Sequence, residues 1–248
     1  IVLSVEYPNI EYIIIDGNST DKTMEIINIC RILIDYFHCF DGNSTDKTME
    51  IVNKYSAYID SITSEEDGGI ADAFNKGIRK ASGDRICFLN AGDYFISPMV
   101  LSKVANDALN NSDTDVIFYK MIYGERNITP PNLYRDNAEM IWENMAIPHQ
   151  ACFCKRDLFG RVGVFDTTFK IRMDYDFFAR CVKQNVSYEY IPEIITVYDD
   201  TGVSSNQKNS YIYLHEGIFV KETYKFSISL KERLRCLKWW FVCTVLKK

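Results

Sequence analysis

Blocks of apolar and polar residues alternate along this chain and predict strands and helices in turn. Residues 10–15 (IEYIII) form an apolar, β-branched run that ends at Asp16, which is typical of a buried strand leading into a loop. Residues 85–89 (RICFL) and 115–120 (DVIFYK) predict two further strands. Because segments of helical periodicity separate these strands, the pattern predicts an α/β fold with a mostly parallel sheet flanked by helices.

The helical segments carry their own start and stop signals. Residues 70–82 have an apolar face at helical spacing, and Gly83 is expected to cap the helix at its C-terminus. Ser97-Pro98 predicts a helix start, with serine as N-cap and proline in the first turn. Further helices are expected near 20–27 and from Met173 onward.

Two of the predicted strands end at acidic residues. Asp16 follows the first strand, and Asp93 follows the strand at 85–89 in the segment Asn90-Ala91-Gly92-Asp93. In open parallel sheets, ligands bind at the carboxyl ends of the strands. This edge of the sheet is therefore the first candidate for a functional site.

The run DGNSTDKTMEI occurs twice, at residues 16–26 and 41–51. Two copies do not make a repeat array, which needs about three units to bury a core, so a local tandem duplication explains the identity better. The first copy follows the stronger strand and is predicted to occupy the site. The second copy is predicted to lie in a loop or helix of a duplicated insert at 27–52.

Composition narrows the choice of partner and compartment. The chain has 248 residues and a net charge of −6, which argues against nucleic acid as a partner. None of its eight cysteines forms a C-x-x-C pair, which argues against a zinc site. Most are expected to be small buried thiols of a protein in a reducing compartment. The first residues show no secretory signal, so a cytoplasmic location is expected.

Four segments together point to a family, although each alone is an ordinary turn or helix start. They read YPNIEYIIIDGNSTDKTMEII, EEDGGIADAFNKGIRKASGDRICFLNAGDYF, HQACFCKRDLF and MDYDFFARC. In this order they resemble the family 2 glycosyltransferases, and in particular the bacterial branch that builds exopolysaccharides and surface polysaccharides. The resemblance implies the GT-A (Rossmann-like) fold, a nucleotide-diphosphate sugar donor, inversion at the sugar and usually a divalent metal, Mg²⁺ or Mn²⁺.

The resemblance also implies roles for the acidic motifs. Asp93 matches the metal-binding acid, although Asn90 and Gly92 stand where the commoner Asp-x-Asp form would offer further acids. A metal held by one carboxylate would depend on donor phosphates and water. Asp174 matches the base that deprotonates the acceptor hydroxyl, with capping of the helix as the structural alternative and Asp176 as a competitor for either role.

The remaining candidates by resemblance bind substrate. Asp16, Asp67 and Asn75 match positions that line the nucleotide pocket. Asn90 is a further substrate-binding candidate and lies at the strand end that carries Asp93. His149 matches a short motif on the acceptor side, where the expected acceptor is a saccharide or a lipid-linked sugar.

The C-terminal tail is basic and amphipathic. Residues 231–248 carry six lysines and arginines against one glutamate, and leucines recur at helical spacing beside Trp239 and Trp240. This pattern fits peripheral contact of residues 228–248 with an anionic membrane surface, at the inner face of the cell membrane, and it equally fits a helix docked on the core.

These features predict a glycosyltransferase domain at 1–205 and a helical tail at 206–248. The chain is expected to lack the family's first strand, because Ser4-Val5-Glu6 resembles the helix that follows that strand. Three hypotheses follow for its activity: an active glycosyltransferase of polysaccharide biosynthesis, a non-catalytic module that binds nucleotide-sugars, and a nucleotidyltransferase. The last predicts a basic, Gly-rich phosphate loop near the first strand, which does not occur in the sequence.

Overall fold

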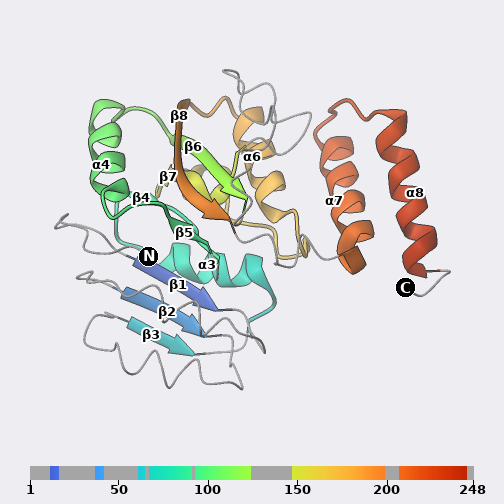
Figure 1. Cartoon of the computed structure of the whole chain (residues 1–248), viewed down its shortest axis with the longest axis horizontal. Coiled ribbons are helices and arrows are strands. Elements are labelled where there is room, and N and C mark those ends of the chain that lie inside the picture. The colour runs from blue at the N-terminus through green and yellow to red at the C-terminus, as the bar shows by residue number, and fades with distance from the viewer. Residues whose placement is uncertain are drawn as a thin grey trace.

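The computed structural model arranges the chain as two β-sheets with helices around them (Figure 1). It describes residues 12–16, 37–41, 61–64, 67–90, 93–123, 147–198 and 207–244, and for the first three of these segments it describes the backbone alone. The helix predicted near 20–27, residues 1–11 with the expected loss of a first strand, and most of the insert at 27–52 lie outside the described residues.

The first sheet is parallel and consists of β1 (Tyr12–Asp16), β2 (Phe37–Asp41) and β3 (Ser61–Ser64), in that order. The strand predicted before Asp16 is confirmed. The weaker run before the second copy also forms a strand, since β2 pairs with β1 on one side and β3 on the other. Pairing on both edges outweighs the weaker local preference of this run for a strand. Asp16 and Asp41 are partners in the register and end neighbouring strands.

The second sheet is mixed. Its strands are β4 (Arg85–Ile86), β5 (Tyr94–Phe95), β6 (Val116–Tyr123), β7 (Cys152–Lys155) and β8 (Tyr188–Tyr198). Their order is β4-β7-β6-β8-β5; β6 and β8 run parallel, and the other three pairs are antiparallel. The α/β class and the strand at 115–120 are confirmed. The sheet is divided in two, however, and the strand predicted at 85–89 keeps only two paired residues.

A bulge interrupts the pairing of β6 with β8. Tyr119 pairs with Ile191, but the next residue, Lys120, pairs with Ile194. Pro192 lies in the skipped segment. Proline has no amide hydrogen to donate to the ladder, so an irregular position in the sheet accommodates it best.

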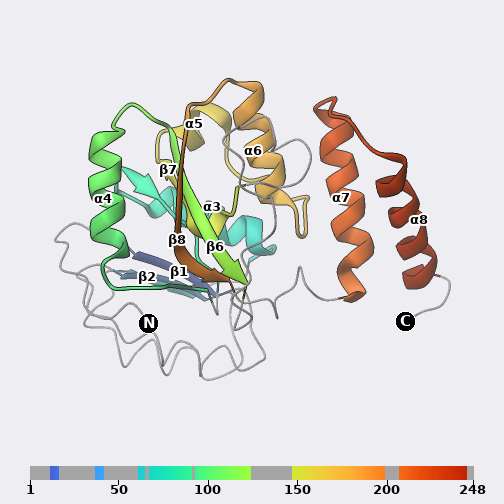
Figure 2. The ribbon, with the colours of Figure 1, turned by 45° about the horizontal axis from the view of Figure 1, so that its top comes forward.

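Helices surround the second sheet (Figure 2). They are α3 (Ile70–Lys80), α4 (Val100–Asn110), α5 (Leu158–Val162), α6 (Met173–Lys183), α7 (Ser210–Thr223) and α8 (Leu230–Thr244), with short 3₁₀ turns η4 (His149–Ala151) and η6 (Gln207–Asn209). The helices expected at 70–82, after Met173 and in the tail are confirmed.

Two predicted helix ends are wrong. Gly83 does not cap α3, which ends before Ala81 in an extended conformation, and the Gly83 carbonyl instead accepts a hydrogen bond from Arg156 Nε at 2.9 Å. The helix expected from Ser97 begins at Val100, with Met99 as its N-cap. The Ser97 hydroxyl accepts from the Met99 amide at 3.2 Å, so it stabilises a turn before the helix.

Both faces of the second sheet are buried. Along β6, Val116 and Phe118 belong to a cluster with α3, α5 and α6, whereas Ile117 and Tyr119 belong to a cluster with α4. This alternation is the period of a strand with a helix layer on each side. The first cluster also contains Phe74, Phe88, Phe159, Phe165 and Phe177, whose rings stack or meet edge to face.

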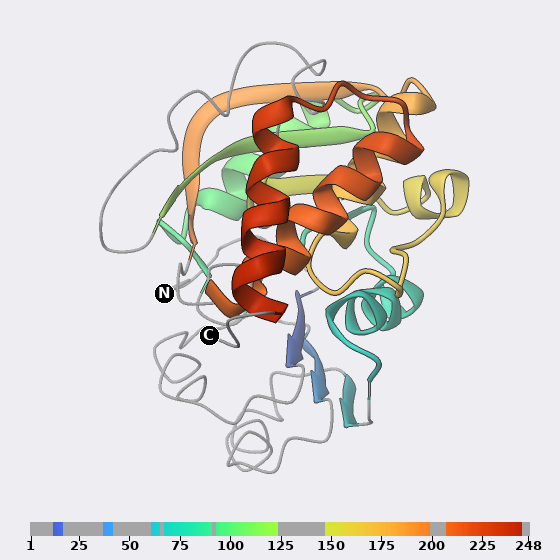
Figure 3. The ribbon, with the colours of Figure 1, turned by 90° about the vertical axis from the view of Figure 1, so that its right-hand side faces the viewer.

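The tail forms a hairpin of α7 and α8 that lies against α6 (Figure 3). Lys221 of α7 is buried and forms an ion pair with Glu232 of α8. The tail therefore contacts α6 through α7, and α8 packs on α7. No helix in the described part of the chain is long and apolar enough to cross a membrane.

Candidate active site

Four residues predicted for the site meet in one chain of hydrogen bonds. The backbone amide of Asn90 donates a hydrogen bond to Asp93 Oδ2 at 3.1 Å. The side-chain nitrogen of Asn90, Nδ2, lies 3.0 Å from His149 Nε2. His149 Nδ1 lies 2.8 Å from Asp174 Oδ2. The loop before β5, the turn η4 and the start of α6 thus bring together residues from three parts of the sequence.

Both ring nitrogens of His149 have hydrogen-bond partners. A carboxylate can only accept, so Nδ1 carries the hydrogen that bonds Asp174, while Nε2 lies against the side-chain amide of Asn90. Phe74 packs edge to face against the His149 ring. This arrangement holds His149 in place and lets it orient the Asp174 carboxylate.

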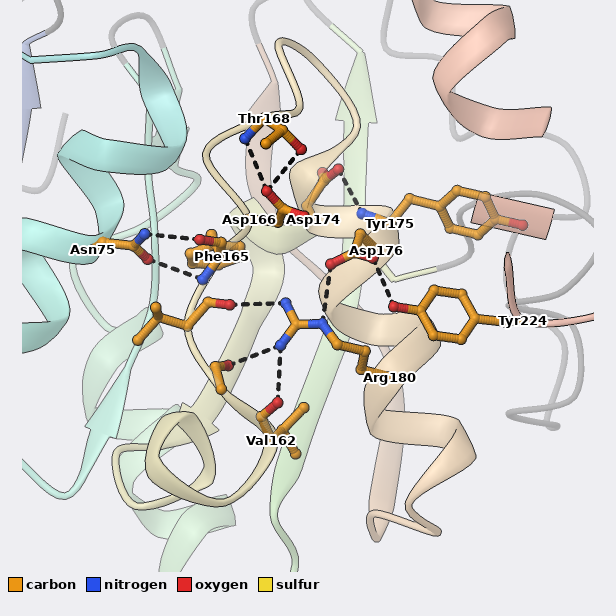
Figure 4. Close-up of polar contacts among 12 residues, drawn as sticks. Asn75, Val162, Phe165, Asp166, Thr168, Asp174, Tyr175, Asp176, Arg180 and Tyr224 are labelled. Carbon is orange, nitrogen blue, oxygen red and sulfur yellow. Dashed lines mark hydrogen bonds and ion pairs between the residues drawn. The ribbon is translucent and has the colours of Figure 1, made fainter. Parts of the chain in front are cut away.

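Asp174 and Asp176 have different surroundings although both lie in the first turn of α6 (Figure 4). Residues two apart on a helix point in different directions. Asp174 accepts from His149 and from the Tyr175 amide at 2.8 Å. Asp176 accepts from Arg180 Nε at 3.0 Å and from the Tyr224 hydroxyl at 2.8 Å, which ties α6 to the C-terminal end of α7. Both oxygens of Asp176 are thus used in contacts with Arg180 and Tyr224, whereas Asp174 bonds His149 in the site.

The loop that leads into α6 is fixed from three sides. Asn75 of α3 makes two hydrogen bonds to the backbone of Phe165, at 2.8 and 2.9 Å (Figure 4). Arg180 donates to the carbonyls of Val162, Gly163 and Val164. Glu216 of α7 accepts from three successive amides, those of residues 170–172. This support positions Asp174 at the N-terminus of α6.

Arg172 precedes the site acid and is buried rather than solvated. Its guanidinium lies between the rings of Tyr175 and Tyr213, at 4.5 and 4.3 Å from their centroids. The burial of Tyr175 raises the pKa of its hydroxyl to about 12, although the Arg172 charge opposes the shift. The sequence left Arg172 open between a phosphate contact and a solvated surface position; the second alternative is wrong.

The nucleotide-side candidates are placed less completely. Asp67 lies three residues before the first residue of α3, and its Oδ1 accepts from the Gly69 amide at 2.9 Å. Asn75 is buried, and its amide group is used by Phe165. Asp16 ends β1, but its side chain lies outside the described residues. The structure therefore unites Asn90, Asp93, His149 and Asp174, while the substrate roles of all seven candidates stay predictions.

Metal binding at this site would rest on few protein ligands. Asp93 is buried and its carboxylate forms one end of the hydrogen-bonded chain. Among the described residues, no group of three or more His, Cys, Asp or Glu side chains gathers to hold an ion. One carboxylate fits a Mg²⁺ or Mn²⁺ ion that arrives with donor phosphates and retains water, and it does not fit an all-protein cage.

Cys87 lies beside the site but does not contribute a reactive thiolate. Its sulfur lies 3.9 Å from the His149 carbonyl oxygen. Burial raises the pKa of this thiol well above its ordinary value, so it stays protonated near neutral pH. Cys152, Cys154 and Cys181 are likewise buried, free thiols, as the sequence predicts for small apolar side chains.

The comparison with protein families agrees with this arrangement. The family model described as glycosyl transferase family 2 matches residues 34–169. The chain belongs to this family. The match begins three residues before β2. It contains the second copy of the duplicated run, with Asp41, and leaves out the first copy.

Curated relatives of this glycosyltransferase are bacterial. A "PGL/p-HBAD biosynthesis glycosyltransferase" of Mycobacterium bovis is 28% identical over 197 residues, which cover 79% of this chain and 68% of the relative. An uncharacterized glycosyltransferase of Haemophilus influenzae is 26% identical over 232 residues, which cover 89% of this chain and 80% of the relative.

Solved structures show the same fold as this glycosyltransferase. Staphylococcus aureus TarS 1-349 in complex with UDP-GlcNAc has a TM-score of 0.65 at 15% identity, covering 95% of this chain and 72% of TarS 1-349. The mannosyltransferase PcManGT of Pyrobaculum calidifontis, in complex with GDP-Man and Mn²⁺, has a TM-score of 0.62 at 14% identity, covering 94% and 68%. The expected GT-A class is thereby confirmed.

The sequence missed the residues that support the site. The ion pair of Asp176 with Arg180 has the i,i+4 spacing of a helix, so the sequence alone could have predicted it. The contacts of Glu216 with residues 170–172 and of Asn75 with Phe165 join segments far apart in the sequence, so no local pattern indicates them.

Proposed function

We propose that this chain transfers a sugar, with inversion, from a nucleotide-diphosphate sugar to a hydroxyl group of a saccharide or lipid-linked acceptor in polysaccharide biosynthesis of the cell envelope. The observation that carries the proposal is the chain of hydrogen bonds from Asp93 through Asn90 and His149 to Asp174. It couples the acid suited to a metal–diphosphate to the acid suited to proton transfer. UDP-GlcNAc and GDP-mannose, bound by the structural neighbours, are the first donors to test.

Asp174 is the proposed base. Inverting transfer needs one group that removes the acceptor proton as the hydroxyl attacks the anomeric carbon, typically worth about 10² to 10⁴ in rate. Asp174 is 7% exposed, and each of its oxygens already accepts one hydrogen bond, which leaves a lone pair for the acceptor hydroxyl. His149 orients this carboxylate and is a positioning residue.

Asp93 is the proposed metal-binding acid. A divalent ion bound there with the donor diphosphate would neutralise charge that grows on the leaving group. Two hydrogen bonds hold Asp93 against Asn90: the Asp93 backbone amide donates to the Asn90 carbonyl, and the Asn90 backbone amide donates to Asp93 Oδ2. Asn90 therefore shapes the turn that carries Asp93 while its side chain contacts His149, so the two ends of the site hold each other in register.

The nucleotide is proposed to bind where the first sheet meets α3. Asp16 is the predicted partner of the base or ribose, with Asp67 at the start of α3 and Asn75 further along it. Asp41 competes with Asp16, because it ends the neighbouring strand in the same register and lies inside the family match. A carboxylate at either strand end would accept hydrogen bonds from a uracil N–H or a ribose hydroxyl.

The acceptor determines where the enzyme works. A lipid-linked acceptor would place the reaction at the cytoplasmic, inner face of the cell membrane, with residues 228–248 in contact with that surface. A relative named a PGL/p-HBAD biosynthesis glycosyltransferase supports a biosynthetic role. The acceptor class is proposed here on that likeness and on the basic tail.

The proposal is tested by release of nucleoside diphosphate from UDP-GlcNAc and GDP-mannose in the presence of Mn²⁺. The wild type is expected to release it, and Asp93→Ala and Asp174→Asn are expected to lose the activity while remaining folded. Calorimetry with UDP and Mn²⁺ measures nucleotide binding directly. It thereby distinguishes an enzyme from the alternative, a non-catalytic module that binds nucleotide-sugars. Binding without turnover of any donor would support that module and contradict the enzyme. The family match rejects the nucleotidyltransferase hypothesis.

A further inference from the structure

Helix α8 presents an apolar stripe that no described residue covers. Its exposed apolar residues recur at spacings of four, three and four: Leu230, Leu234, Leu237 and Phe241, between 49% and 72% exposed. At 3.6 residues per turn, these positions fall within about 60° of one another around the helix axis. They therefore form one continuous face along the helix.

The opposite face of α8 is the one that docks on the protein. Glu232 pairs with Lys221 of α7, and Cys243 contacts the carbonyl of Lys208. These two positions lie about 160° around the axis from the apolar stripe. Docking on α7 and presentation of the stripe are therefore compatible, although the sequence offered them as alternatives.

Positive charge lies beside the stripe. Exposed Lys231 and Lys238 lie on one flank, and exposed Arg233 lies on the other, where it forms an ion pair with Glu222 of α7 at 3.0 Å. The acid of this helix, Glu232, is turned toward α7 and neutralised there. Among the described residues, Lys231 and Lys238 have no ion-pair partner. Trp240 is 46% exposed beside the stripe and has the amphipathic ring that favours a membrane interface.

We propose that α8 lies in the plane of an anionic lipid surface, with the leucines inserted among the acyl chains and the lysines against acidic headgroups. A helix of 15 residues is about 22 Å long, too short to span a bilayer but suited to lie on it. A second copy of the chain fits the stripe less well. An antiparallel pairing of two stripes would place Lys231 and Lys238 of one copy opposite the same lysines of the other.

The proposal deepens the membrane contact included in the proposed function, but its test is independent of sugar transfer. Co-sedimentation is measured without donor or acceptor, using phosphatidylcholine vesicles with and without phosphatidylglycerol. The bound fraction is expected to rise with phosphatidylglycerol and to fall with added salt. Equal binding to both kinds of vesicle, or binding to neither, would overturn the proposal whatever the enzyme assay shows.

Variants locate the surface. Leu234→Gln with Leu237→Gln is expected to lower vesicle partitioning about tenfold or more, because two apolar side chains no longer leave water. The matched control replaces two equally exposed apolar residues near α4, Met99→Gln with Leu109→Gln, and should bind as the wild type does. Equal loss in both pairs would contradict the assignment to α8.

Charge is tested in the same way. Lys231→Gln with Lys238→Gln should weaken binding to phosphatidylglycerol vesicles, whereas the exposed pair Arg79→Gln with Lys170→Gln should not. All variants should keep the thermal midpoint of the wild type. If light scattering shows a wild-type dimer that Leu234→Gln with Leu237→Gln converts to a monomer, the stripe binds a second copy and the lipid proposal is wrong.

Discussion

At the scale of single residues, hydrogen-bond partners separate two aspartates that the sequence treats alike. Asp174 and Asp176 are both buried, acidic and in the first turn of one helix. Asp176 uses both oxygens on Arg180 and Tyr224, and Asp174 faces His149. Chemistry and scaffold can therefore be assigned to different members of the pair.

Amide substitutions at these two aspartates should have different effects. Asp174→Asn keeps an acceptor for the Tyr175 amide but cannot take a proton, so kcat should fall by about 10² to 10⁴ with the unfolding midpoint nearly unchanged. Asp176→Asn weakens the charged bond to Arg180 and should cost about 1 to 3 kcal/mol of stability. Donor turnover and thermal denaturation measure the two effects. A turnover loss confined to Asp176→Asn would reverse the assignment.

Asn75 offers a second test at this scale. Asn75→Ala removes two buried hydrogen bonds to the Phe165 backbone and should lower the free energy of unfolding by about 2 to 4 kcal/mol. Urea denaturation measures this cost. UDP affinity, measured by calorimetry below the transition, tests the substrate role implied by the resemblance. Unchanged affinity in the folded variant would restrict Asn75 to the scaffold.

At the scale of elements, one ion pair fastens α8 to α7. Burial alone would raise the pKa of Glu232, but the hydrogen bonds from Lys221 and Ser229 outweigh it, so the pKa lies below its ordinary value. A carboxylate whose pKa is lowered in the folded state stabilises the fold at pH values above its ordinary pKa of 4.5. This stabilisation is lost as the pH falls through the folded-state pKa.

Docking of α8 should therefore weaken at acid pH. Hydrogen exchange of the α8 amides is expected to accelerate as the pH drops below about 4.5, after correction for intrinsic exchange. Glu232→Gln should exchange faster at neutral pH and should lose this acid-dependent step. Asp157→Asn, at an exposed position before α5, is the control. An acid step of the same size in Glu232→Gln would exclude the ion pair as its cause.

At the scale of the whole molecule, the duplicated run raises the question of which copy binds the nucleotide. Tertiary pairing gives both copies equivalent places, because β1 and β2 end side by side at Asp16 and Asp41. The strength of the local strand signal favours the first copy, and the extent of the family match favours the second.

Separate alanine substitutions should resolve this. Asp16→Ala and Asp41→Ala make the same change at two register partners, so each is the control for the other. The copy that binds nucleotide should lose about tenfold or more in UDP affinity, consistent with about 1.5 to 3 kcal/mol for a hydrogen bond to a charged group. Calorimetry with UDP and Mn²⁺ measures it. Equal and unchanged affinities would remove both from the nucleotide site.

The sequence by itself determined the fold class, the strands before Asp16 and after Asp115, the helices at 70–82, after Met173 and in the tail, and the choice of Asp93 and Asp174 as candidate acids. These are set by local periodicity and by short motifs, whose signals survive without tertiary contacts. It could not determine that His149 bonds Asp174 or that Asn75 supports Phe165, because these contacts join residues 25 and 90 positions apart. It also misplaced two helix ends, where capping depends on turns and on neighbours such as Arg156.

Only the tertiary structure decided the arrangement of the sheets and the use of each face of the tail. Strand order and direction depend on which edges meet in space, so the mixed second sheet left no local trace and strand β2 left only a weak one. Helix α8 reads as amphipathic in the sequence, but the position of α7 decides which face is covered. The physical reason is the same in each case: hydrophobic periodicity fixes an element, while its partners depend on the packing of the whole chain.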